Sequence, residues 1–150
     1  MQVAISNLIT PGNAATGIDQ LCAINGISLV IASKIYRFCV PNIGAAVDRH
    51  TSYFFNSLSV RGQGTPTHFQ REWANGAHTS SRLATYNPAG YASNRAQYFQ
   101  EYLPLLAAIS NSLNNATSQY RCAASGVYRN WFPTDVEMAA YYYWARYGVR

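Results

Sequence analysis

The chain has 150 residues, which suits one domain that buries about two thirds of the surface exposed by its unfolded form. Its residues are 49% hydrophobic and only 11% charged, well below the roughly 25% charged residues of an average soluble domain. A compact domain with an Asn-, Ser-, Thr- and Tyr-rich surface is therefore expected. The chain does not open with a basic-then-apolar leader, and Lys34 and Arg37 interrupt its longest apolar stretch, Ile24 to Val40. These features argue against secretion and against a membrane partner.

The charge favours a nucleic-acid partner. The formal net charge is +5, and Lys34 is the only lysine among the 11 basic residues, so the others are arginines. Arginine binds phosphates and guanines through two parallel hydrogen bonds and stacks on bases, which lysine does not. With 12 Tyr and 3 Trp, this composition is typical of a nucleic-acid-binding protein. The alternative is a lineage with Arg-rich codon usage.

The cysteines and histidines give no sign of a metal site or a cofactor. Cys22, Cys39 and Cys122 are odd in number and lack Cys-x-x-Cys spacing, so we interpret them as buried free thiols in a reducing compartment. The three histidines are too scattered to suggest zinc binding. We expect no metal, no cofactor and a cytoplasmic protein, nucleoid-associated if the chain is bacterial.

The first features in chain order are a short apolar run and a helix. An apolar run, Val3–Ile9, is stopped by Thr10-Pro11-Gly12, and Asn13 is placed to cap a helix that reaches Cys22. The inward face of that helix is predicted to comprise Ile18, Leu21 and Cys22.

A tight turn and a second helix follow. Gly26 stands between two helical patterns, where a hairpin needs a residue that accepts a positive φ, and Ile27 is expected to anchor the turn. Ser28 is a plausible N-cap for the helix Leu29–Val40, whose first amides form an anion site. The core stripe of this helix is predicted to be Ile31, Ile35, Phe38 and Cys39, with Lys34 and Arg37 on the solvent face, where they can hold a DNA phosphate irrespective of sequence.

An isolated carboxylate lies just beyond this helix. Asp48 and His50 occur in Ala46-Val47-Asp48-Arg49-His50-Thr51, ahead of a helix Arg49–Leu58. Asp48 is placed to be the N-cap of that helix.

Residues Ile24 to Leu58 together resemble the helix-hairpin-helix DNA glycosylases of base-excision repair. The resemblance implies that Asn25, Gly26, Ile27 and Ser28 clamp the DNA backbone. It also implies that Asp48 and His50 form the family's Asp-x-His motif, with Asp48 as the catalytic carboxylate and His50 among the DNA-binding residues. Asp48 is thus either only a helix cap or also a catalytic group, and the two roles are compatible.

The chain departs from the family pattern at several positions. The family usually has Pro and a second Gly where Asn25 and Ser28 stand, and its bifunctional members have a nucleophilic lysine where Val30 stands. Val30 cannot form a Schiff base, so the resemblance implies a monofunctional enzyme without lyase activity. Several helices precede the hairpin in the family, so this chain is either a fragment or a reduced domain.

A loop-rich stretch is expected at about residues 59–92, because helical periodicity fails there and Gly and Pro punctuate it. Such a long segment inside a compact domain is often functional. Its arginines are interleaved with aromatic residues, a pattern that indicates a surface for bases and phosphates. The alternative is a loop packed against the domain. The residues concerned are Arg61, Arg71 and Arg82, with Phe69, Trp73 and Tyr86.

Helical patterns return in the last third of the chain. A long pattern opens at Ser93, and Pro104 is expected to kink or divide it. A short helix is predicted over Thr117–Ala124, and Thr134–Glu137 is interpreted as the capping box of a final helix. The buried stripe of that helix is predicted to be Val136, Ala140, Tyr143 and Tyr147.

No strand pattern is evident in the sequence, so we expect an all-α, orthogonal domain of about six to eight helices that contains a helix-hairpin-helix. The leading functional hypothesis is a duplex-DNA-binding protein resembling a monofunctional DNA N-glycosylase that acts on a damaged base. The alternatives are a non-catalytic DNA-binding module and a helical protein-interaction domain.

Overall fold

The computed structural model of the protein describes residues 1–60 and 88–148. These ranges are mostly helical, as the sequence predicted, although they also contain a two-stranded sheet. In chain order the elements are α1 (Gln2–Ile9), α2 (Ala14–Cys22), α3 (Leu29–Cys39), α4 (Arg49–Val60), α7 (Pro88–Gln97), the π-helical segment η1 (Tyr98–Tyr102), α8 (Leu103–Asn115), β1 (Tyr120–Arg121), β2 (Tyr128–Arg129) and α9 (Pro133–Tyr147).

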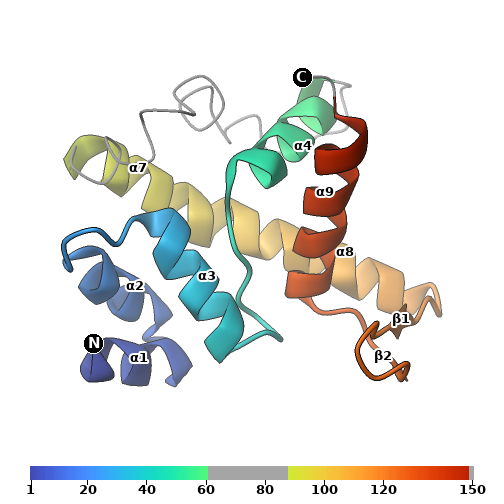
Figure 1. Ribbon diagram of the computed structural model, residues 1–150, viewed down its shortest axis with the longest axis horizontal. Helices are drawn as coiled ribbons and strands as arrows, with labels where there is room; N and C mark the ends of the chain where they lie inside the picture. The colour runs from blue at the N-terminus through green and yellow to red at the C-terminus, as the bar shows by residue number, and fades with distance from the viewer. Residues whose placement is uncertain (61–87, 149–150) are drawn as a thin grey trace.

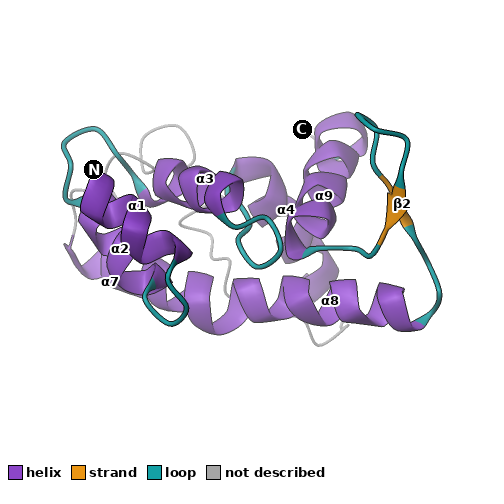
Figure 2. Ribbon diagram, turned by 90° about the horizontal axis from the view of Figure 1, so that it is seen from below, coloured by secondary structure: helices purple, strands orange, loops and turns teal. Residues whose placement is uncertain are grey.

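One long helical rod supports the other elements. α7, η1 and α8 follow one another along a single axis, with α1, α2 and α3 near one end and α4 and α9 toward the other (Figures 1 and 2). The segment that joins α3 to α4 runs between these two groups (Figure 1). This segment is therefore within reach of side chains from several helices.

The rod changes its hydrogen-bonding pattern just before Pro104. The backbone N–H of Leu103 donates to the carbonyl of Tyr98, five residues earlier instead of four. Proline has no N–H to donate and its ring crowds the preceding turn, so a wider π-turn can absorb the misfit while the helical path continues. The predicted interruption of the helix is therefore the π-helical segment Tyr98–Tyr102, which ends just before Pro104. Tyr98 and Tyr102, at the two ends of this segment, are buried in the core.

The prediction of a helix over Thr117–Ala124 is wrong, as is the expectation that the chain has no strand. β1 and β2 form an antiparallel hairpin with Tyr120 opposite Arg129. The guanidinium of Arg129 lies 4.6 Å from the ring centre of Tyr120, and it donates to both carboxylate oxygens of Asp135 at 2.6 and 2.9 Å. Contacts across several residues therefore override the helical preference of this short stretch.

The predicted core stripe of α3 is wrong at Ile31 and Phe38, whereas Ile35 and Cys39 are partly buried and pack against the core. Phe38 is 75% exposed and Ile31 is 43% exposed. The buried residues of α3 are Leu29, Ala32, Ser33 and Tyr36, a stripe with the spacing of one helix face. Ser33 and Tyr36 carry hydroxyl groups, so this face of α3 looks less hydrophobic in the sequence than the neighbouring face with Ile31 and Phe38.

The final helix begins earlier than predicted. Its N-cap is Phe132, and the carboxylate of Asp135 accepts the backbone N–H of Phe132 at 2.8 Å, so the box starting at Thr134 is wrong. Tyr143 and Tyr147 are exposed instead of buried, whereas Val136 and Ala140 face the core as predicted. Both ends of the predicted loop-rich stretch are helical, because α4 continues to Val60 and α7 begins at Pro88. The rest of that stretch, residues 61–87, lies outside the described residues.

Candidate site at the Ala45–Asp48 segment

The segment before Asp48 is buried but belongs to neither a helix nor a strand. Ala45, Ala46 and Val47 are each at most 1% exposed. Buried backbone groups need hydrogen-bond partners, and here side chains supply them. The hydroxyl of Tyr98 donates to the carbonyl of Ala45, and the hydroxyl of Tyr102 donates to the carbonyl of Ala46, both at 2.6 Å.

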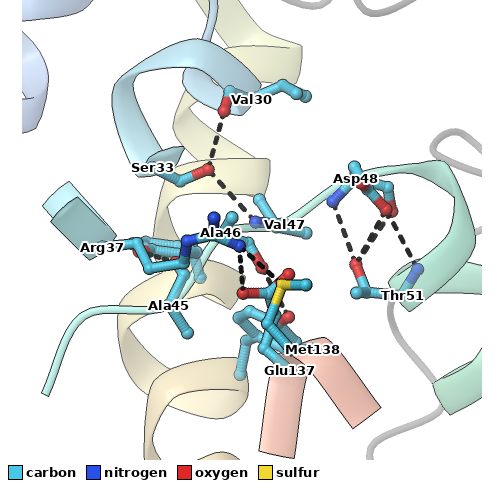
Figure 3. Close-up of polar contacts among 12 residues, drawn as sticks. Val30, Ser33, Arg37, Ala45, Ala46, Val47, Asp48, Thr51, Glu137 and Met138 are labelled. Atoms are coloured by element: carbon cyan, nitrogen blue, oxygen red, sulfur yellow. Dashed lines mark hydrogen bonds and ion pairs between the residues drawn. The ribbon is translucent and has the colours of Figure 1, made fainter. Parts of the chain in front are cut away.

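The opposite side of the segment is held by α3 and α9 (Figure 3). The backbone N–H of Val47 donates to Ser33 Oγ at 3.1 Å, and the backbone N–H of Ala46 donates to the Glu137 carboxylate. Four side chains from three parts of the chain therefore fix the path that leads to Asp48. Hydrogen bonds from core side chains therefore determine where Asp48 lies.

Glu137 is the charged member of this network. It is 2% exposed, and Arg37 Nη1 donates to its Oε2 at 3.0 Å. Burial raises the pKa of Glu137, while Arg37 and the Ala46 N–H oppose the rise. The prediction that Arg37 faces solvent is wrong, because its guanidinium joins α3 to α9 through Glu137.

The two tyrosines are suited to a permanent donor role. Burial raises the pKa of Tyr98 and of Tyr102 well above that of an ordinary tyrosine. Both hydroxyls therefore keep their protons at neutral pH and continue to donate to the segment.

Asp48 caps α4, as predicted. Its Oδ1 accepts the backbone N–H of His50 at 2.9 Å and that of Thr51 at 3.1 Å, and its own N–H donates to Thr51 Oγ1 at 3.0 Å. These bonds satisfy amides that the first turn of a helix leaves without partners. Asp48 is partly buried and stands at the end of the segment that the four side chains hold.

The turn between α2 and α3 has the predicted backbone. Gly26 has a φ of +88°, the Ile27 N–H donates to the Ile24 carbonyl at 3.0 Å, and Ser28 Oγ accepts the Ile31 N–H at 3.4 Å as the N-cap of α3. Asn25 and Gly26 are exposed, whereas Ile27 packs partly against the core. The turn therefore presents its polar end to solvent.

The first turn of α3 lies beside the segment that carries Asp48. Ser33 Oγ donates to the Val30 carbonyl at 2.9 Å while accepting the Val47 N–H, so one hydroxyl connects the two parts of the chain (Figure 3). Lys34 is exposed on α3, and the His50 ring contacts Tyr141 edge-on with 5.0 Å between centroids. Ser33 thus joins the first turn of α3 directly to the segment before Asp48.

Three of the predicted DNA-binding residues cannot be placed relative to Asp48. Arg61, Arg71 and Arg82 lie outside the described residues. Sequence reasoning missed Ser33, Tyr98, Tyr102 and Glu137 as members of the site. A spacing of four residues puts the two tyrosines on one face of a helix, but their partners are backbone atoms that no side-chain pattern reveals.

Comparison of the chain with protein-family models, with curated proteins and with solved structures gave no match. Within residues 1–60 and 88–148, no group of three or more His, Cys, Asp or Glu side chains is placed to hold a metal ion. In the same ranges, no helix combines the length and the apolar character needed to cross a membrane. A function for this site is therefore inferred from its geometry.

Proposed function

We propose that the protein binds duplex DNA and acts as a monofunctional DNA N-glycosylase on a damaged base, with Asp48 as the catalytic carboxylate. The observation that supports this best is the position of Asp48. Asp48 is only partly buried, its carboxylate is held by two backbone N–H groups, and it follows a buried segment fixed by four side chains. The proposed setting is the bacterial nucleoid or the cytoplasm.

This geometry suits the chemistry of base excision. Breaking a glycosidic bond develops positive charge on the sugar as the base leaves with the bonding electrons, and water then adds to the sugar carbon. A carboxylate that is already in place stabilises such charge without reorganising during the reaction. The base must first leave the duplex stack for a side chain to reach this bond. The cap fixes Asp48 Oδ1, so its orientation is set before the substrate arrives.

In this proposal, the turn between α2 and α3 contacts the DNA backbone. Asn25 and Gly26 are exposed at the N-terminal end of α3, where the amides and the helix dipole favour a phosphate. Lys34 is exposed on the same helix, and the chain carries a net charge of +5. Such contacts position a protein on DNA without reading sequence.

A second candidate function is a non-catalytic DNA-binding module. It is favoured by the cap itself, because the two hydrogen bonds to Asp48 Oδ1 are a sufficient structural reason for an aspartate at this position. In that case the turn still binds DNA but base excision does not occur.

A fluorescent duplex titrated with the protein at increasing salt tests DNA binding. Neutralising about three to five phosphates predicts a slope of log K against log salt near −3 to −4. Gly26→Val should weaken binding, because a β-branched residue strains a turn with φ of +88°.

Gly12→Val is the matched control for this experiment. Gly12 has a φ of +83°, and like Gly26 it has open space where a Cβ would stand, but it lies in the turn between α1 and α2. The control should lose stability to a similar degree and keep its affinity for DNA. An affinity that does not depend on salt, or no binding at low salt, would contradict the proposal.

A further inference from the structure

The C-terminal half of α9 exposes a cluster of aromatic residues. Tyr142, Tyr143 and Tyr147 are 57%, 53% and 61% exposed, respectively. Helical spacing places Tyr142 beside Arg146 and Tyr143 beside Tyr147, since side chains four residues apart are neighbours on a helix. We call these four residues the tyrosine face.

The tyrosine face is held in place by its own contacts and by α4. Arg146 Nη1 donates to the Tyr142 hydroxyl at 2.7 Å, and the rings of Tyr143 and Tyr147 lie 5.3 Å apart. Phe54 of α4 meets Tyr143 edge-on at 5.7 Å between ring centroids. The exposed rings are therefore ordered before any partner binds, which lowers the entropy lost on binding.

The charged side chain that α9 contributes to the tyrosine face is the cation of Arg146. Between Met138 and Gly148 the sequence contains no acidic residue. The two carboxylates earlier in α9, those of Asp135 and Glu137, are buried and paired with Arg129 and Arg37. The Arg146 guanidinium lies 5.9 Å from the ring centre of Tyr142 and 5.5 Å from that of Tyr147, so the face combines a cation with aromatic rings.

We propose that the tyrosine face binds single-stranded nucleic acid, with unpaired bases stacked on Tyr142 and Tyr147 and a phosphate held by Arg146. Proteins that bind single strands combine aromatic platforms with positive charge, because every base has a face that can stack whatever its sequence. Because α9 carries no acidic side chain from Met138 to its end, this part of the helix does not repel the phosphate backbone. This site is separate from the turn at Gly26 and does not depend on base excision.

The test is the affinity of the folded chain for fluorescent oligothymidylate, with oligouridylate as the arm that separates DNA from RNA. The double variant Tyr142→Ser, Tyr147→Ser should bind about 5-fold to 100-fold more weakly for each stacked base that is lost. Tyr128→Ser is the matched control, because Tyr128 is 61% exposed on β2 and outside the tyrosine face. The control should bind as the wild type does.

A second variant tests the phosphate contact. Arg146→Gln should reduce the steepness of log K against log salt by about 0.7, the value for one phosphate contact on a single strand. Arg121→Gln removes an exposed arginine from the hairpin and should leave the slope unchanged. Gly26→Val should leave oligothymidylate binding unchanged, so failure of the duplex proposal is distinguishable from failure of this one.

Two results would overturn the inference. The first is equal affinity of the wild type, the double variant and Tyr128→Ser for both oligonucleotides. The second is binding of the chain to vesicles of phosphatidylcholine and phosphatidylserine that the double variant loses, without measurable oligonucleotide binding. That second result would identify the tyrosine face as a membrane-contacting surface.

Discussion

The two halves of α9 reverse the usual distribution of residues in a helix. Its first half buries two carboxylates, Asp135 and Glu137, whereas its second half exposes three tyrosines. Charged residues are almost never fully buried unless they are paired. The first half of α9 therefore holds other parts of the chain in place, while the second half presents its aromatic side chains to solvent.

The buried carboxylates have the partners that this role requires. Asp135 accepts two hydrogen bonds from Arg129 and one from the Phe132 N–H, and Glu137 accepts bonds from Arg37 and the Ala46 N–H. Taking a carboxylate out of water is unfavourable unless such bonds replace its hydration. Each carboxylate therefore anchors a separate segment: Asp135 holds the hairpin, and Glu137 holds the segment before Asp48.

Replacing Glu137 should have the largest effect on stability. Glu137→Ala leaves the Ala46 N–H and the Arg37 guanidinium without their acceptor, and we expect the free energy of unfolding to fall by about 3 kcal/mol. Urea denaturation followed by circular dichroism measures the change. Tyr142→Ala, in the exposed half of the same helix, is the comparison and should stay within about 0.5 kcal/mol of wild type. Equal losses in the two variants would remove the distinction between the halves of α9.

A smaller effect concerns pH. Because burial raises the pKa of Glu137 in the folded state above its ordinary value of 4.5, the folded chain binds this proton more tightly than the unfolded chain does. The stabilising contribution is complete below 4.5 and is lost as the pH rises through the raised pKa. Glu137→Gln does not titrate and lacks this dependence.

The stability of wild type relative to Glu137→Gln should therefore decline as the pH rises from about 4 to 8. Urea denaturation of both proteins at several pH values measures the difference, with salt held constant. A difference that grows in favour of wild type over this range would show that the attraction of Arg37 outweighs the cost of burying the charge.

Local chemistry predicted the backbone features that depend on one or two neighbouring residues. The positive φ at Gly26, the Ser28 cap and the Asp48 cap all follow from the conformational freedom of glycine and from short polar side chains next to free amides. The presence of helices at α2, α3, α4 and α9 was also predictable from periodicity. Such features need no knowledge of the rest of the fold.

The features that depend on distant partners were not predictable. Arg37 and Glu137 are 100 residues apart, and neither has a neighbour in sequence that indicates the pair. Tyr98 and Tyr102 bond to backbone carbonyls, which every residue carries, so their partners leave no trace in residue type. The hairpin over Tyr120–Arg129 was missed for a similar reason, since Arg129 is fixed by Asp135 in the next helix.

Measuring base excision tests directly whether Asp48 is catalytic. Duplexes that carry oxidised, alkylated or deaminated bases are incubated with wild type and with Asp48→Asn, and free base is measured. Asn caps a helix about as well as Asp, so the variant should keep its fold and its affinity for DNA, whereas Asp48→Ala should lose about 1 kcal/mol of stability. A neutral amide lacks the charge that the developing cation needs.

Wild type should excise at least one lesion, and Asp48→Asn should lose most of that activity. Excision that survives in Asp48→Asn would contradict the catalytic role of Asp48. Absence of excision by both proteins across the whole panel, with DNA binding retained, would contradict the enzyme and leave the binding module.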